Sequence, residues 1–386
     1  GLLLFLTELV LLMFGFPVAF TFAAVAVIFA LATDIMQLFA MMPFRIYSIM
    51  TNTTLIAVPL FIYMGVLLQR SGLAERLLES MGALFGKVRG GITVSTVIVG
   101  AILAASTGVV GASVVAMAVI ALPVMLKYNY SLRLSAGTIC ASGTLGQIIP
   151  PSIILIILGE VLQVPVGDLF KAAFIPGLSL AAIYIVYILG YAFIKRDVAP
   201  AMPDDGTPKS VVVKAALKAI IPPLVLILLV LGSIFFGIAT PTESAAVGAI
   251  ASIGLAILYR RFSFRMVYES ALETSKITAM VFAILIGATA FSLVFSYTGG
   301  EQEIHDFLLA LPGGTWGFLL FSMALIFALG FFIDFVEICY IVVPVLVPVA
   351  SKMGLDMVWF GIIIAMNLQT SFLTPPFGFS LFYLKG

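Results

Sequence analysis

The sequence predicts an all-α polytopic membrane protein, built as inverted repeats with two re-entrant helical hairpins and two interrupted helices. Three observations predict this fold class. The 386 residues are 62% hydrophobic and only 10% charged, a balance that a water-soluble surface does not allow. Apolar segments of about 20 residues, long enough to cross roughly 30 Å of hydrocarbon, follow one another along the chain. Two proline motifs, Leu122-Pro123-Val124 and Ile149-Pro150-Pro151, recur at one shared offset as Val347-Pro348-Val349 and Thr374-Pro375-Pro376.

The apolar segments expected to cross the membrane lie at about residues 2–31, 51–69, 135–159, 170–195, 214–236, 240–259, 276–298 and 357–384. The first is too long for the core of a signal peptide and lacks a positive leader, so we interpret it as a span. The segments 135–159 and 357–384 contain the Pro-Pro motifs. We expect both to be interrupted helices, because proline lacks an N–H donor and disfavours helix at the residue before it.

Two further apolar stretches, 92–126 and 313–351, are too long for one helix and too short for two crossings joined by a polar loop. Their middles contain Ser106-Thr107-Gly108 and Ile333-Asp334-Phe335. We expect each stretch to form two half-length helices that meet at a tip inside the membrane. Such a tip requires protein or a wet cavity around its free backbone groups.

The positive charges test this topology. With a cytoplasmic N-terminus and re-entrant hairpins, sixteen Lys and Arg residues fall on the cytoplasmic side and three on the other. The cytoplasmic set is Arg70, Arg76, Lys87, Arg89, Lys127, Arg133, Lys195, Arg196, Lys209, Lys214, Lys218, Arg260, Arg261, Arg265, Lys276 and Lys385, and the outer set is Arg45, Lys171 and Lys352. Cytoplasmic loops carry an excess of Lys and Arg, and treating either hairpin as a single crossing would destroy this asymmetry.

The topology divides the chain into a first repeat at 1–196, a cytoplasmic linker at 197–213 and a second repeat at 214–386. The linker is rich in Pro, Gly and Asp, which is typical of a loop. The first hairpin enters from the cytoplasm and the second from outside, so the repeats face opposite ways. The span at 170–195 has no counterpart before residue 386, and we expect a further C-terminal helix beyond it.

The breaks are the candidate binding region. A Pro-Pro pair leaves several carbonyls without helical partners, and nearby Gly, Ser and Thr residues let the chain unwind and add oxygen atoms. Helices broken at matching places of two repeats point to the binding site of a secondary transporter. A single kink is often only structural, but two breaks that each pair with a hairpin tip predict two related sodium sites with substrate between them.

Membrane-embedded carboxylates are functional candidates by default. Asp334 and Glu337 lie at the second tip, where binding and tip stabilisation both remain open for Asp334. For Glu243 we favour a structural role, as the first-turn acid of a helix capped by Thr240 or Thr242. His305 is expected to be a solvated residue of an outer loop. The two cysteines, Cys140 and Cys339, are expected to be small packing residues and not a disulfide.

Several function classes find no support in the sequence. A net charge of +1 does not indicate a nucleic-acid partner. The chain contains no phosphate-binding loop, no metal-spaced Cys/His cluster and no serine with an activating histidine, so we do not expect an enzyme. Uphill transport by this chain would therefore need an ion gradient or a partner.

Three motifs resemble the large membrane subunit (M) of the tripartite ATP-independent periplasmic (TRAP) transporters, within the ion-transporter superfamily. They are Gly143 to Ser152, Gly237 to Gly248, and Asn367 to Gly378, and the resemblance covers essentially the whole chain. It implies an elevator mechanism in the bacterial inner membrane, in which hairpins and broken helices move against a scaffold. It also implies two protein partners, a small four-helix membrane subunit (Q) and a periplasmic substrate-binding protein (P). The surrounding membrane lipid is a further expected partner.

The resemblance also implies positions for the sites. The first sodium site falls at Ser106 and Thr107, with carbonyls near Gly146, Ile149 and Pro151. The second falls near Gly330 and Asp334, with Thr370, Ser371 and Thr374. The expected substrate contacts are Gly108, Ser142, Gly143 and Asn367.

The leading hypothesis is import of a small carboxylate with two or more sodium ions. Each net positive charge that moves inward gains about 2.3 kcal/mol per 100 mV, so extra sodium ions make import strong and electrogenic. The alternatives are an ion channel, a proton-coupled carboxylate transporter and, third, a membrane-embedded enzyme.

Overall fold

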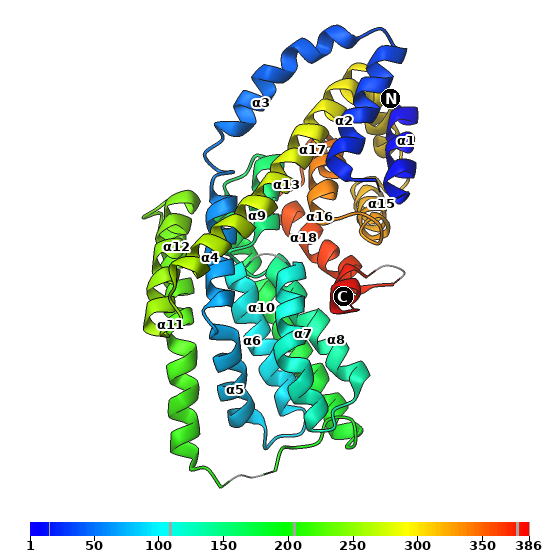
Figure 1. Ribbon diagram of the computed structural model, residues 1–386. Helices are drawn as coiled ribbons and strands as arrows, with labels where there is room; N and C mark the ends of the chain where they lie inside the picture. Colours follow the sequence, from blue (N-terminus) through cyan, green and yellow to red (C-terminus); the bar gives the residue numbers. More distant parts are fainter. Residues whose placement is uncertain (15, 108–109, 204–205, 376–377, 386) are drawn as a thin grey trace.

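The computed structural model describes residues 1–386 except 15, 108–109, 204–205, 376–377 and 386, and within that part every regular element is helical (Figure 1). The first half contains α1 (Leu2–Met13), α2 (Val18–Ala32), a 3-10 turn (Met36–Met41), α3 (Met42–Met50), α4 (Ala57–Arg70), α5 (Leu73–Phe85), α6 (Gly91–Thr107), α7 (Val110–Lys127), α8 (Leu132–Thr144), a second 3-10 turn (Leu145–Gln147), α9 (Ile153–Leu162) and α10 (Val166–Ile194). The second half contains α11 (Lys209–Phe235), α12 (Pro241–Leu258), α13 (Phe264–Tyr297), α14 (Gly300–Leu309), α15 (Gly314–Leu329), α16 (Phe335–Glu337), a π turn (Ile338–Val342), α17 (Val343–Lys352), α18 (Met357–Leu373) and α19 (Phe379–Lys385).

Five helices among the described residues are long and apolar enough to cross a membrane, or six if the bent pair α4–α5 counts as one span. Many large apolar side chains on α10, α11 and α12 are exposed, which is the surface that a lipid environment requires. The fold is therefore that of a multi-pass membrane protein.

The expectation of one span at 2–31 is wrong, because the chain forms α1 and α2 with a break between Met13 and Val18. Pro17 is the N-cap of α2, and a proline there cannot continue the preceding helix. The pair packs on α13, where Phe5 contacts Phe295 and Phe22 contacts Phe291 with ring centroids 6.2 and 5.5 Å apart.

Three short elements fall where no helix was expected. They are α3 with the turn before it, α5, and α14, which occupies the expected outer loop around His305. Helix α5 continues α4 after a bend of 58°. Gly72 lies at this bend with φ of 72°, a left-handed conformation that glycine adopts without the Cβ clash of other residues.

Each of the two expected hairpin stretches contains two helical segments. Stretch 92–126 becomes α6 and α7, which pack on each other and on α8, and stretch 313–351 becomes α15 and the α16–α17 run. The interrupted helices are also observed, as α8 and α9 in the first half and as α18 and α19 in the second. The order helix, break, helix, then interrupted helix thus occurs in both halves. How these elements are oriented in a membrane stays a prediction.

Two predicted boundaries shift in the second half. Helix α11 begins at Lys209, inside the expected linker 197–213, and α13 begins at Phe264, well before the expected residue 276. Ser263 caps α13 by accepting a hydrogen bond from the Met266 N–H at 3.1 Å. The start of the linker is bound to the base of the first hairpin, since the N–H groups of Gly90 and Ser131 donate to the carbonyls of Ala199 and Val198.

Candidate functional site

Helices of the hairpins and interrupted helices from both halves pack together in the middle of the molecule (Figure 1). Helix α19 packs on both α7 and α8, and α18 packs on α9 and on the turn after α8. A Cβ atom at Gly330, in the second hairpin break, would overlap Ser371 on α18, and one at Gly111 would lie 2.9 Å from the Tyr383 ring on α19. Segments from both halves of the chain therefore form one region, as two facing sites require.

The break after α8 is formed by residues 145–152, all of them buried. The Ser152 hydroxyl donates to the Gln147 carbonyl at 2.6 Å and accepts from the Leu155 N–H at 3.5 Å, which starts α9. Gly146 and Ile149 lie inside this turn, and Ile149 packs against Gly177 of α10. The Pro150–Pro151 peptide bond is cis. The break thus presents backbone oxygen atoms in a buried turn, the type of group that binds sodium in broken helices.

The break after α18 carries three hydroxyl groups. Those of Thr370, Ser371 and Thr374 donate to the carbonyls of Asn367, Leu368 and Thr370 at 2.7, 2.8 and 2.8 Å. A hydroxyl that donates its proton to the backbone keeps its oxygen lone pairs for an outside group. Thr374 itself is extended, with φ of −99° and ψ of 131°, and ends the helix. This end of α18 can therefore offer several oxygen atoms to a cation.

The carboxylates of the second hairpin break bind backbone donors. Asp334 Oδ1 accepts from the Phe335 N–H at 2.7 Å, and Glu337 Oε2 accepts from the Asp334 N–H at 3.0 Å. Together they form a capping box at the start of α16. Both side chains thus stabilise the break, and a role of Asp334 in binding stays a prediction.

Two of the four predicted substrate contacts lie in helix crossings. Ser142 is fully buried against Gly100 of α6, and a Cβ atom at Gly143 would overlap Val114 of α7. Asn367 is half-buried, and its Nδ2 donates to the Met323 carbonyl of α15 at 2.6 Å. The role of these residues in binding stays a prediction. Gly108 and the side chains of Ser106 and Thr107 lie outside the described residues, so the first hairpin tip stays a prediction as well.

Three of the buried side chains that the sequence reasoning did not single out carry polar atoms without a hydrogen-bond partner among the described residues. Both side-chain polar atoms of Gln147, the Oε1 of Gln369 and both carboxyl oxygens of Glu8 make no hydrogen bond there. Gln147 and Gln369 lie in or beside the two breaks, where a bound ligand would satisfy them. Glu8, in α1, is 2% exposed and interacts electrostatically with Glu337. The sequence feature that could have identified Glu8 is a single acidic residue within an apolar segment.

The remaining predictions concern residues away from the breaks. Thr240 caps α12, and Glu243 completes a capping box by accepting from the Thr240 N–H at 2.8 Å, so the predicted structural role is confirmed. Both cysteines are free and buried, as expected. His305 is partly buried in helix α14, not in a loop, and its ring lies 3.3 Å from Asp306. This contact holds the pKa of the Asp306 carboxyl below its usual range.

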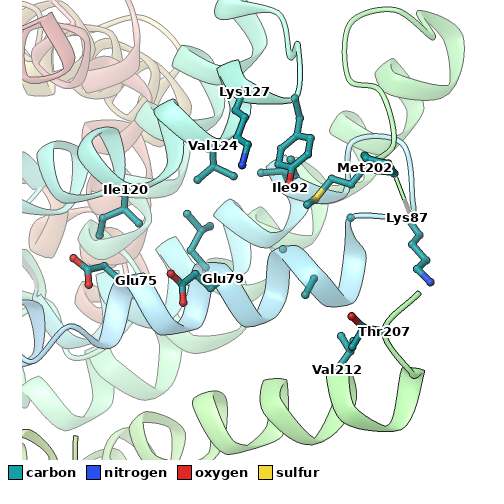
Figure 2. A pocket seen from close by; sticks show the side chains of 16 residues that line it. Glu75, Glu79, Lys87, Ile92, Ile120, Val124, Lys127, Met202, Thr207 and Val212 are labelled. Carbon is teal, nitrogen blue, oxygen red and sulfur yellow. The ribbon is translucent and has the colours of Figure 1, made fainter. Parts of the chain in front are cut away.

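A cavity of about 360 Å³ lies well away from the breaks, at the base of the first hairpin. Figure 2 shows Glu75 and Glu79 projecting side by side from α5 toward Ile120 of α7, with Lys127 and Met202 across the cavity. Its lining combines apolar side chains with charges of both signs. It contains none of the residues predicted to bind sodium or substrate.

Comparison with known proteins gives a consistent result. The family model described as "Tripartite ATP-independent periplasmic transporter, DctM component" matches residues 5–386. The C4-dicarboxylate TRAP transporter large permease protein DctM of Pseudomonas aeruginosa is 32% identical over 88% of this chain and 78% of its own length. The ectoine/5-hydroxyectoine TRAP transporter large permease protein UehC of Ruegeria pomeroyi is 32% identical over 98% of this chain and 88% of its own length. The sialic acid TRAP transporter large permease protein SiaM of Vibrio cholerae is 30% identical over 97% of this chain and 87% of its own length.

Proposed function

The chain belongs to the DctM family of TRAP transporter large permease subunits, and from this premise we propose that it couples import of a small organic acid to sodium ions. It is a permease subunit and not an enzyme. The substrate class is supported by the relatives named above, whose C4-dicarboxylate, ectoine and sialic acid substrates all carry carboxylate groups. The proposed location is the bacterial inner membrane.

The convergence of the two interrupted helices carries the proposal. Each break offers oxygen atoms to a cation and adds no fixed positive charge. Gln147 and Gln369, in or beside the breaks, carry buried polar atoms without a hydrogen-bond partner among the described residues. Oxygen atoms from unwound helix are what sodium binds in transporters, while helix N-termini favour an anionic substrate. Two sodium ions per monocarboxylate would then move one net positive charge inward.

The proposed movement is of the elevator type. The hairpins and interrupted helices would move as one body against a frame in which α12 and α13 both pack on α4. A polar contact joins the segment before α4 to the interrupted helix, where Asn52 Nδ2 donates to Glu160 Oε1 of α9 at 2.7 Å. Breaking a hydrogen bond to a carboxylate costs about 1.5–3 kcal/mol net, so this contact alone would not prevent such a movement.

The proposed partners are a small four-helix membrane subunit and a periplasmic substrate-binding protein that delivers the acid. The family description supports this, because it calls the transporter tripartite and this chain's family one component of it. An ion channel would need no such delivery protein.

Uptake into proteoliposomes tests the proposal. Vesicles containing the permease with its small subunit, supplied with the loaded binding protein, should accumulate labelled acid only when sodium is outside. An inside-negative potential should increase the rate, since net positive charge enters. Equal uptake after replacing sodium by potassium or choline would contradict sodium coupling. Uptake without the binding protein, at a rate far above transporter turnover, would indicate a channel.

Proton coupling is the second candidate, and Glu8 is the observation that favours it. A buried carboxyl group without a partner is a candidate for carrying a proton. The same vesicles distinguish the two, because a proton-coupled permease should take up acid in choline buffer when the outside is acidic.

A further inference from the structure

A second cavity, of about 840 Å³, lies between α5, α11 and the end of α12. Four basic side chains from these three elements line it: Arg76, Lys218, Arg260 and Arg261. All four belong to the side of the protein that the charge count predicts to be cytoplasmic. No residue of the proposed sodium or substrate sites lies here. The cavity thus collects positive charge away from the transport site.

The basic side chains are not neutralised within the cavity. Among the described residues, the side chains of Lys218 and Arg260 make no hydrogen bond or ion pair. Arg76 donates to the Tyr259 carbonyl at 3.2 Å and lies 4.9 Å from the centre of that ring, which orients the guanidinium but leaves its charge. The Arg261–Glu75 pair is 3.9 Å apart and more than half exposed on both sides, so it contributes little.

Two carboxylates also border the cavity, Glu75 and Glu79. In Figure 2 both project toward the neighbouring cavity beside α7. Four cations against two such carboxylates leave the lining positive. An anion that bound here would be contacted by α5, α11 and the segment after α12 together.

The other part of the lining is apolar and continues onto the outer surface. Ala219, Pro222 and Leu258 line the cavity, and Leu258 is 64% exposed. Next to it on α11, Leu217, Ile221 and Leu224 are exposed as well. A cluster of Lys and Arg at the cytoplasmic end of membrane helices, beside an apolar surface, suits a headgroup and its acyl chains. A free phosphate ion would use only the basic part.

We propose that this cavity binds the phosphate headgroup of an anionic phospholipid, with the acyl chains on the exposed apolar surface of α11 and α12. The bound lipid would connect α5 to α11 and α12. Because α5 also packs on α6 of the first hairpin, the lipid would brace the frame next to the part proposed to move. This inference does not depend on which ion drives transport.

Native mass spectrometry of the purified full chain, titrated with phosphatidylglycerol or phosphatidylcholine, tests the proposal. Lys218→Gln with Arg260→Gln should weaken phosphatidylglycerol binding about thirtyfold, since each Lys or Arg near the headgroup contributes about fivefold. Phosphatidylcholine binding should not change. The matched control is Lys209→Gln with Lys214→Gln, which removes two charges of α11 outside the cavity and should change binding less than twofold. The conservative pair Lys218→Arg with Arg260→Lys should keep binding and excludes misfolding as the cause.

Three results would overturn the proposal. The first is an equal loss of affinity in the control pair and the cavity pair, because this would indicate a general effect of charge. The second is displacement of phosphatidylglycerol by inorganic phosphate at millimolar concentration, because this would indicate that the cavity binds a soluble anion. The third is loss of phosphatidylglycerol binding when the small membrane subunit is present, because this would mean that the subunit occupies this surface.

Discussion

Single hydroxyl groups at the end of α18 carry the chemistry of the proposed second sodium site. Thr374 donates to Thr370 and keeps its oxygen lone pairs for a cation. Replacing Thr374 by Ala should raise the sodium concentration needed for half-maximal uptake roughly tenfold, the expected loss for one bond to a charged group. Protein abundance should stay near that of the unaltered chain.

The control for Thr374 is Thr289→Ala, because Thr289 makes the same backbone bond, to Leu285 at 2.7 Å, within the regular helix α13. It should leave the sodium dependence unchanged. An equal loss of abundance and sodium response in Thr374→Ala would show that the hydroxyl is only structural.

Glu8 is the residue at which sequence reasoning failed most clearly. Helix length and mean hydropathy describe a segment and ignore one acid within it, and the burial of that acid depends on how α1 packs on distant elements. Replacing Glu8 by Met removes a buried polar group without partners and should stabilise the chain by about 1–3 kcal/mol, seen as a higher Tm in detergent. Sodium-driven uptake should persist. Loss of uptake in both Glu8→Met and Glu8→Gln would instead support the proton-coupled candidate.

At the scale of elements, the breaks were predictable and the short amphipathic helices were not. Pro150–Pro151 and Pro375 interrupt helices for a local covalent reason, which the sequence alone reveals. Pro17 acts in the same way, yet the length of the apolar run 2–31 concealed it. Helices α5 and α14 are stabilised by tertiary contacts with α6 and α17, and no run of apolar residues indicates them.

Close contact between α7 and α8 should control the stability of the first hairpin. Gly143→Ala places a methyl group into Val114 and should cost about 1–3 kcal/mol, measured by thermal unfolding in detergent. Gly137 lies on the same helix with nothing within 4 Å of an added Cβ, so Gly137→Ala should be neutral or stabilising by up to about 1 kcal/mol. If both variants had the same Tm, this crossing would not limit stability.

For the whole molecule, the sign of the loop charges is a property of the entire chain, and the topology that it indicates stays a prediction. Individual ligands could not be predicted, since they depend on ångström-scale placement of the breaks. Cysteine labelling tests the topology: Arg196→Cys should react with an impermeant reagent only from the cytoplasm, and Lys352→Cys only from outside. Cys140 and Cys339 are buried and should give no background. Labelling of both positions from one side would exclude the predicted arrangement of the second hairpin.

The central claim is that two broken helices form two sodium sites. Equilibrium binding of radioactive sodium to the purified chain tests it most directly. Two sites require at least two bound ions per chain, and Thr374→Ala should lose one and keep the other. A chain that binds no sodium, or a Thr374→Ala variant that binds as much as the unaltered chain with the same affinity, would contradict it.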